Sequence, residues 1–257
     1  KRPLPLILMF LVLHVLIPAS AYGVGHLFFP ENINYITGIV LEFSVPVAVI
    51  SLMWVSIYNG NNPLSLSLVI LDTILSPFLI PATLKILVGS NIKMDTAGMM
   101  KELVFMIALP AVIAMCLNEF SHGKVMETWP KKLAPFSKMC LIFVVTSNSS
   151  KVSPYIKHLN GERLAVTAVI LVLSASGYAI GWLIAIVTKQ NKEATVSMIY
   201  GSGMRNISAG AVIAGAYFPA ECLFPVMIGT LFQQILAAFY GSLVRRIQMS
   251  QCKKEDI

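Results

Sequence analysis

Two short segments combine helix-breaking residues with polar side chains inside long apolar stretches. The first runs from Glu42 to Pro46, and the second surrounds Arg205. Proline removes a backbone donor and frees carbonyl groups, and glycines around a serine make a poor continuous helix. Unwound backbone of this kind can bind small charged solutes. The candidate binding residues in the two segments are Ser44, Pro46, Ser202, Gly203, Met204, Arg205 and Asn206. The alternative is that Pro46 only kinks a helix and the glycines only allow close packing.

Arg205 is the most informative single residue because an arginine inside an apolar helix costs about 2.5–3.5 kcal/mol unless it is paired or wetted. Asp72 is the first expected partner, since Ser65, Asp72 and Ser76 share one helical face. Glu42 is the second expected partner and a possible proton carrier. His14 is a secondary candidate, although a lone histidine in an apolar run is more often a hydrogen-bonded core residue than a ligand. An Arg205–Asp72 pair would serve either a purely structural role or a role in coupling or substrate binding. If no such pair forms, we expect Arg205 to bind the negative group of a substrate.

Nothing in the sequence resembles an enzyme or a metal centre. G-x-S-x-G, H-E-x-x-H and phosphate-binding glycine motifs are absent, as are paired catalytic carboxylates. The four cysteines are scattered without metal-ligand spacing. Charged residues make up only 12% of the chain, which excludes disorder, a coiled coil and a nucleic-acid module. The net charge of +7 does not restore a nucleic-acid role, because the basic residues sit in short clusters beside apolar runs.

The apolar runs are long enough to cross a membrane. Asp, Glu, Lys and Arg are absent between Pro3 and Phe29, between Phe43 and Leu71, between Leu164 and Thr188, and between Cys222 and Val244. A membrane-spanning helix needs about 20 apolar residues. The chain is therefore predicted to be an all-α polytopic membrane protein embedded in a lipid bilayer. Its eight predicted helices cover residues 3–28, 34–57, 63–88, 96–118, 134–155, 164–188, 195–217 and 220–245, and a polar loop is expected from Glu119 to about Lys132.

The distribution of Lys and Arg predicts the orientation. If the first helix starts in the cytoplasm, twelve basic residues lie inside and four (Lys93, Lys151, Lys157 and Arg163) lie outside. Cytoplasmic loops carry the excess of positive residues. We therefore expect a multi-pass protein of the cytoplasmic (inner) membrane with both ends of this chain inside. The first and last helix triplets then have opposite topology, each with an interrupted second helix, which is typical of secondary transporters.

The sequence resembles the bile acid:sodium symporter family at these breaks and along essentially its whole length. Gly203-Met204-Arg205-Asn206 is similar to the Gly-Met-Gln-Asn motif of that family, and Ile17–Ala21, Leu75–Ala82 and Ala97–Met99 continue the likeness. The resemblance implies an inverted-repeat fold of ten helices with two broken, crossing helices, divided into core and panel domains. The chain is expected to begin at the third of these helices. Residues 1–94 and 161–257 would then form the two core halves, and residues 95–160 the panel helices.

The resemblance also implies two sodium sites, and most of their side chains differ here. Ser51 and Ser65 match the family pattern. The positions at which the family has Gln, Asn, Thr, Glu and Gln are occupied here by Leu13, Leu52, Val69, Gly201 and Arg205, respectively. Sodium needs oxygen ligands, which leucine, valine and glycine side chains do not supply. Sodium coupling is therefore doubtful, and no other metal or cofactor is expected.

The functional interpretation is a secondary active transporter of a small organic anion that works by alternating access. The substrate would bind near the bilayer midplane, between the broken helices. Two alternatives stay open: a transport-inactive membrane module that binds a ligand or partner, and a channel or efflux relative of the same superfamily. The sequence indicates neither the identity of the anion nor the oligomeric state.

Overall fold

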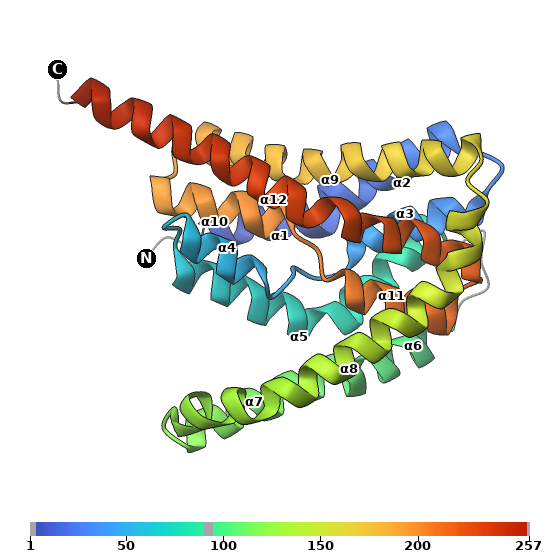
Figure 1. Ribbon diagram of the computed structural model, residues 1–257, viewed down its shortest axis with the longest axis horizontal. Helices are drawn as coiled ribbons and strands as arrows, with labels where there is room; N and C mark the ends of the chain where they lie inside the picture. The colour runs from blue at the N-terminus through green and yellow to red at the C-terminus, as the bar shows by residue number, and fades with distance from the viewer. Residues whose placement is uncertain (1–3, 90–94, 256–257) are drawn as a thin grey trace.

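The computed structural model describes residues 4–89 and 95–255, and this part of the chain is almost entirely helical (Figure 1). The helices in chain order are α1 (Leu4–Leu11), α2 (Ile17–Phe28), α3 (Ile33–Ser44), α4 (Ser51–Ile57), α5 (Asn62–Leu87), α6 (Thr96–Leu103), α7 (Leu109–Phe120), α8 (Lys124–Lys157), α9 (Gly161–Val187), α10 (Lys192–Gly203), α11 (Ile207–Tyr217) and α12 (Ala220–Glu255). Two π-helical turns, η1 (Val12–Leu16) and η2 (Val104–Ala108), join α1 to α2 and α6 to α7 without a break.

Five helical segments of the described chain are long and apolar enough to cross a membrane. They are Leu4–Phe28, Asn62–Leu87, Thr96–Phe120, Gly161–Val187 and Ala220–Arg246. Each has 25 to 27 residues, about the length that a bilayer requires. The predicted all-α polytopic membrane fold is confirmed. The count of eight spans stays a prediction, because α3 with α4, α10 with α11, and α8 do not meet the same test of length and hydropathy.

Asparagines position the starts of five helices. The side chains of Asn32, Asn61, Asn160, Asn191 and Asn206 each accept a hydrogen bond from the backbone N–H three residues later. Such a cap satisfies one of the free amides of the first turn. Four of these residues lie in the polar separators that the sequence marks between apolar runs, and the fifth, Asn206, lies at the break inside one run.

The polar segment between α7 and α8 is mostly helix, so the expectation of a loop from Glu119 to Lys132 is wrong. The turn occupies only Ser121–Gly123, where His122 and Gly123 have φ values of 51° and 84°. Lys124 then starts a helix of 34 residues with Glu127 in its first turn, where a negative side chain is favourable. Polarity in this segment marks an exposed helix end, which sequence hydropathy does not distinguish from a loop.

Both expected breaks are confirmed. The backbone between α3 and α4 leaves the helical conformation after Ser44, with Val45 extended at φ −70° and ψ 155°. Met204 is likewise extended at φ −101° and ψ 129°, and it separates α10 from α11. The two connecting segments lie side by side midway along the bundle (Figure 1), where Val47 and Arg205 form an antiparallel bridge. Pro46 and the glycines therefore interrupt two helices and do not merely kink them.

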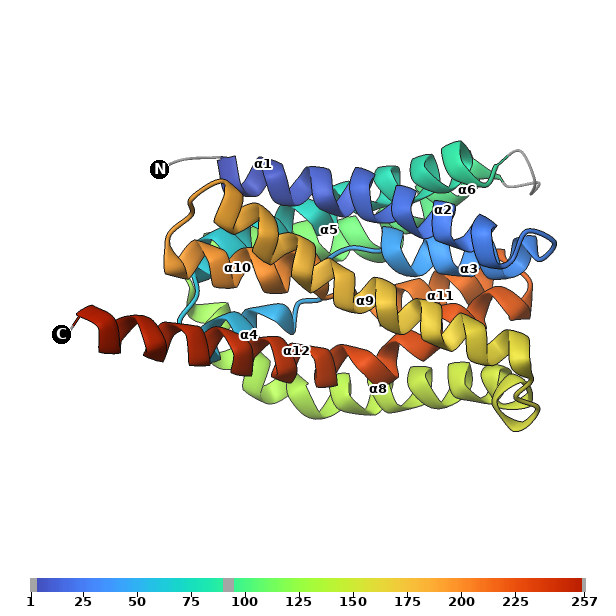
Figure 2. The same ribbon diagram turned by 90° about the horizontal axis from the view of Figure 1, so that it is seen from above.

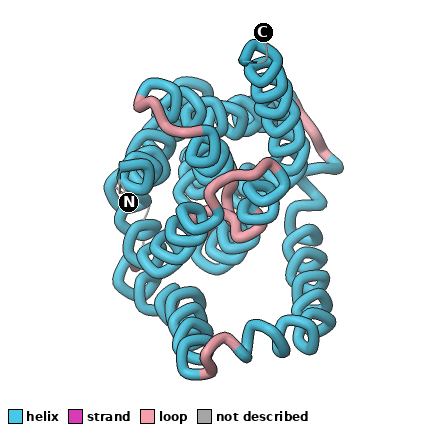
Figure 3. The backbone as a smooth tube through the Cα atoms, turned by 90° about the vertical axis from the view of Figure 1, so that its left-hand side faces the viewer, coloured by secondary structure: helices cyan, strands magenta, loops and turns pink. Residues whose placement is uncertain are grey.

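The long helices run along one axis, and the start of α1 and the end of α12 lie at the same end of the bundle (Figures 1 and 2). Viewed end-on, helices are joined by short loops (Figure 3). Helix α12 packs against α3 and α9, and α10 packs against α9. By contrast, only 11% of the apolar window in Thr96–Phe120 is buried, against 39–50% in the other four spans. Helices α6 and α7 therefore lie at the margin of the described bundle.

Candidate functional site at the helix crossover

Backbone hydrogen bonds join the two interrupted helices at their crossing point. The amide of Ala48 donates to the carbonyl oxygen of Met204 over 3.2 Å, and the amide of Asn206 donates to the carbonyl of Pro46 over 2.7 Å. The side chain of Gln233 on α12 accepts from the Arg205 amide over 2.8 Å. Backbone groups that the breaks release inside the bundle are thus paired again, as a membrane interior requires.

The Arg205 side chain extends from this crossover into the protein interior. Only 3% of its surface is exposed. Its Nη1 and Nη2 atoms are buried and have no hydrogen-bond partner among the described residues. The expected ion pair with Asp72 is wrong, and so is the alternative pair with Glu42, because neither carboxylate forms a salt bridge with Arg205. Arg205 interacts with both carboxylates only at longer range.

Asp72 does not reach Arg205 because both of its oxygens are already bonded. Oδ1 lies 2.8 Å from Nε2 of His14 on η1, and Oδ2 accepts a hydrogen bond of 2.6 Å from the Val47 amide. The carboxylate is completely buried, and the His14 side chain is 10% exposed. The hydrogen bond expected of His14 is present, and its role as a secondary binding candidate stays a prediction. The pairing of His14 with Asp72 was not predicted. The signal available in the sequence is that both are isolated polar residues in apolar runs.

Glu42 is buried on α3 without a described hydrogen bond for Oε2. Its other oxygen faces Gly229 of α12, close to the position that a Cβ atom there would take. Glu42 therefore interacts with Arg205 electrostatically and not through a hydrogen bond. The structure therefore brings two acidic side chains near one guanidinium without bonding either to it.

The remaining predicted site residues divide into backbone-bound and free groups. Ser44 donates to the Val40 carbonyl over 2.6 Å, and Asn206 caps α11 by accepting from Ala209. Gly203 lies directly against the ring of Tyr178. The three hydroxyls of this set that are buried without a described partner belong to Ser51, Ser65 and Ser202. Pro46, Met204, Arg205 and Asn206 are brought together at the crossing itself.

The positions that would supply sodium ligands in the resembled family form an apolar cluster. Leu13 and Val69 pack with Met9, Val47, Leu68, Ala185 and Met198, and Leu52 packs against this group. A Cβ atom added at Gly201 would lie 2.8 Å from Leu68 Cδ2 and 3.0 Å from Met9 Sδ. The space for a longer oxygen-bearing side chain at position 201 is thus filled by the side chains of Leu68 and Met9. Of these positions, only Ser51 and Ser65 carry a side-chain hydroxyl, so any further ligands of a sodium ion would have to be backbone carbonyls such as those around Ser202 and Met204.

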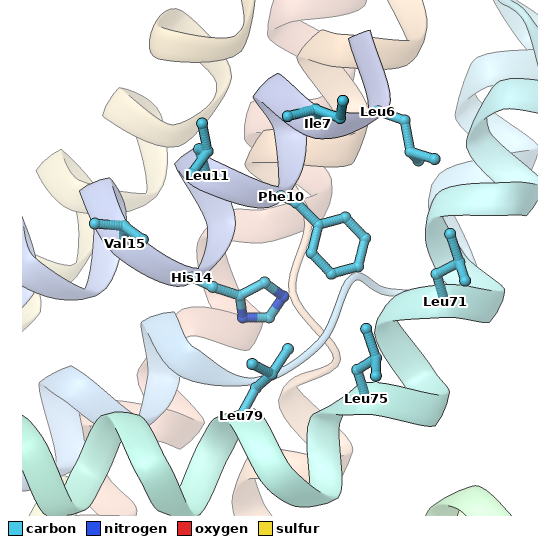
Figure 4. Close-up of a pocket in the computed structure, with 9 residues that line it drawn as sticks. All are labelled: Leu6, Ile7, Phe10, Leu11, His14, Val15, Leu71, Leu75 and Leu79. Carbon is cyan, nitrogen blue, oxygen red and sulfur yellow. The ribbon is translucent and has the colours of Figure 1, made fainter. Parts of the chain in front are cut away.

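A groove of about 460 Å³ lies between α1 with η1 and α5 (Figure 4). His14 is the polar member of its nine lining residues, which are Leu6, Ile7, Phe10, Leu11, His14, Val15, Leu71, Leu75 and Leu79. The groove is therefore an apolar surface feature, with His14 among its lining residues.

Comparisons with known proteins give a matching family and individual relatives. Residues 1–159 match the sequence profile of the Sodium Bile acid symporter family. The chain is 41% identical over 249 residues to the uncharacterized protein YbaS of Bacillus subtilis, a match that covers 97% of this chain and 81% of that protein. It is 24% identical to the probable sodium/metabolite cotransporter BASS3, chloroplastic, of Arabidopsis thaliana, covering 94% of this chain and 57% of that protein. It is 21% identical to the uncharacterized sodium-dependent transporter YocS of Bacillus subtilis, covering 96% and 77%.

Proposed function

The chain belongs to the sodium bile acid symporter family, a family of transporters, and on this basis we propose that it carries a small organic anion across the membrane by alternating access. The membrane environment follows from the five long apolar helices. Relatives are named as sodium/metabolite cotransporters, which fits a small-molecule substrate. We place the chain in the cytoplasmic membrane, and the Lys and Arg bias favours an orientation with both of its ends inside.

The observation that carries the choice of an anion is the buried guanidinium of Arg205. Its two terminal nitrogens are shielded from solvent and bonded to no described residue. The planar fork of arginine matches a carboxylate with two parallel hydrogen bonds. Helix α11 also begins beside Arg205, and the partial positive charge at a helix start favours a negative group. A substrate carboxylate would thus complete a site that the protein leaves without a bonded counter-charge.

The movement that we propose is a displacement of the core helices relative to α6–α8. The crossing segments tie α3, α4, α10 and α11 together through backbone hydrogen bonds. Helices α6 and α7 bury little of their surface, and α7 has no buried residue. Residues 1–94 and 161–257 would therefore move as two core halves, and residues 95–160 would form the panel against which they move.

Sodium is not required in this proposal, although several relatives are named as sodium-dependent transporters or sodium cotransporters. The apolar cluster of Leu13, Val69 and their neighbours occupies the side-chain positions that would coordinate it. The fixed charge of Arg205 lies in the same region and supplies a positive potential without a bound cation.

Uptake by purified protein in proteoliposomes tests the proposal. Radiolabelled pyruvate, succinate and taurocholate represent small, doubly charged and large anions. Arg205→Gln should lower uptake of a transported anion by tenfold to a hundredfold, because hydrogen bonds to charged groups contribute roughly 1.5–3 kcal/mol. Arg205→Lys should retain part of the activity, since it keeps the charge and loses the fork. Arg163→Gln is the matched control, because Arg163 bonds to helix-end carbonyls outside the crossover.

The same assay separates the alternatives. A transport-inactive binding module would bind an anion in equilibrium dialysis without accumulating it in vesicles. A channel would give flux that does not saturate with anion concentration. Wild-type uptake by Arg205→Gln for every transported anion would contradict the assignment of Arg205.

A further inference from the structure

Helices α6–α8 bury their residues against the rest of the described bundle at one end. On α6, Met99 and Leu103 are buried in the largest hydrophobic cluster, and Tyr155 near the end of α8 packs against the same cluster. By contrast, no residue of α7 is buried, and Phe120 at its end is 83% exposed. Figure 1 shows α7 and the start of α8 diverging from the other helices toward the end where both termini lie. The two groups of helices are therefore tightly packed where α6 starts and loosely packed at the opposite end.

A polar contact crosses between the two groups at the tightly packed end. The hydroxyl of Tyr217, the last residue of α11, donates a hydrogen bond to Oε2 of Glu102 on α6. Glu102 precedes the buried Leu103, and the Tyr217 ring packs against the same hydrophobic cluster as Leu103. The hydrogen bond thus joins the segment 95–160 to the second core half at a point where both are already in contact.

The location of Glu102 makes this bond important to it. Glu102 belongs to the long apolar segment Thr96–Phe120, and an acidic side chain in a membrane-spanning segment is costly unless it has a partner. Lys101 is its neighbour in sequence, but adjacent residues on a helix do not face each other. No Lys or Arg of the described residues forms a salt bridge with Glu102. The described partner of Glu102 is therefore a hydroxyl that comes from another helix.

Helix α11 connects this contact to the crossover. It begins beside Arg205, where Asn206 caps its first turn, and it ends at Tyr217. A helix of 11 residues is about 16 Å long. If α11 moves as one unit, a displacement that breaks the Tyr217 bond also displaces the backbone next to Arg205.

We propose that the hydrogen bond between Tyr217 and Glu102 is a latch that holds α6–α8 against the second core half at the end where α6 starts. This inference rests on the proposed function, because the division into a core and a panel that move against each other belongs to that proposal. The latch is closed in this conformation, and the loosely packed end is the open one. Release of the latch is the step that allows the two groups to separate at the α6 end.

The strength of such a bond suits a reversible latch. The net contribution of an intramolecular hydrogen bond corresponds to about a twofold to tenfold change in an equilibrium constant. Loss of the bond should therefore shift the population toward the released state without unfolding the protein. The competing explanation is that Met99, Leu103 and their neighbours hold this end by packing alone, and that the hydroxyl only satisfies Glu102.

Thiol labelling in detergent distinguishes these explanations without any substrate. Cys116 on α7 is exposed and stays as an internal standard, while the other three cysteines are replaced by alanine. Met99→Cys places a reporter at a completely buried position of the latched end. Its rate of reaction with a charged methanethiosulfonate follows the population in which this end is open. Tyr217→Phe should raise that rate about twofold to tenfold relative to Cys116.

Three further variants identify the bond as the cause. Glu102→Leu should raise the rate by the same factor, whereas Glu102→Gln should stay close to the wild type because its amide oxygen can still accept from Tyr217. Tyr217→Phe should have no further effect in the Glu102→Leu background, since the latch is already absent. Tyr22→Phe is the matched control: Tyr22 packs against the same cluster and its ring contacts His26 of its own helix. It should leave the rate unchanged.

Three results would overturn the proposal: a labelling rate that Tyr217→Phe does not change, independent effects of Tyr217→Phe and Glu102→Leu in the double variant, or an equal increase in Tyr22→Phe. If Met99→Cys fails to fold, Leu103→Cys supplies a reporter at the same end, where Leu103 is 1% exposed. None of these measurements needs a transported anion. A failure of the Arg205 uptake experiment is therefore distinguishable from a failure here.

Discussion

Replacement of Asp72 by leucine or asparagine should separate the contribution of its two hydrogen bonds from that of its charge. Leucine removes both acceptors and leaves the Val47 amide and the His14 ring without their bonds. Each buried polar group that loses its partner costs about 1–3 kcal/mol, so Asp72→Leu should lower the free energy of unfolding by about 2–6 kcal/mol. Asparagine has a similar shape, and its oxygen can accept from Val47 while its amide donates to a neutral His14.

Asp72→Asn therefore loses only the strengthening that ionisation gives to two hydrogen bonds, about 1–2 kcal/mol in total. At about 2–4 °C per kcal/mol for a chain of this size, the leucine variant should melt about 4–24 °C lower and the asparagine variant about 2–8 °C lower. Apparent melting temperatures can be followed at pH 7 in detergent by the fluorescence of the three tryptophans.

Asp95→Asn is the matched control for this experiment. Asp95 caps α6 by accepting from the Gly98 amide, and asparagine caps a helix start about as well as aspartate. Its melting temperature should stay within about 1 °C of the wild type. A leucine variant as stable as the wild type would refute the reasoning, because it would mean that apolar packing replaces the Asp72 pair without loss, as happens for some buried ion pairs.

The remaining predictions concern the packing of the crossover. Gly203→Ala should cost about 1–3 kcal/mol, because its new Cβ would overlap the Tyr178 ring, whereas Gly23→Ala, with open space at the same point, should be neutral or stabilising in the same melting assay. Ser65→Ala should leave stability unchanged or raise it by up to about 1 kcal/mol, because its buried hydroxyl has no described partner. Replacing 100 mM potassium chloride by sodium chloride should change the melting temperature of the wild type by less than about 1 °C, since a ligand stabilises only the state that binds it; a rise of several degrees that Ser65→Ala abolishes would show a sodium site.

The two helix breaks were predictable because they depend on local chemistry. Pro46 lacks an amide hydrogen, and Gly201 and Gly203 flank a serine. Each helix break can therefore be predicted from the residues of its own segment. The polar separators between the apolar runs likewise placed most helix ends within a few residues. The start of α8 was missed because Lys124–Lys132 is polar, and polarity alone does not distinguish an exposed helix from a loop.

The partner of Arg205 could not be predicted in the same way. Helical periodicity places Ser65, Asp72 and Ser76 on one face, but it does not say which side chain of a neighbouring helix that face meets. His14 precedes Asp72 by 58 residues, and Val47 offers only a backbone amide, which has no sequence signature. Opposite formal charges in a membrane segment suggested an ion pair. In the structure, Asp72 instead bonds to the two groups next to it, the His14 ring and the Val47 amide.

The residues that differ from the family pattern at the sodium positions pack with one another. This packing supports the proposal that sodium is not required. A single leucine among oxygen ligands would leave the other ligands buried and unpaired, which is unfavourable. Here Leu13 and Val69 occur in one packed cluster, and Gly201 is covered by Leu68 and Met9. Matched changes of this kind preserve packing as they remove polarity. Ser51 and Ser65 keep the family residue types, yet their hydroxyls have no described partner. Residue identity at two positions therefore says less about ion binding than the packing of the positions around them.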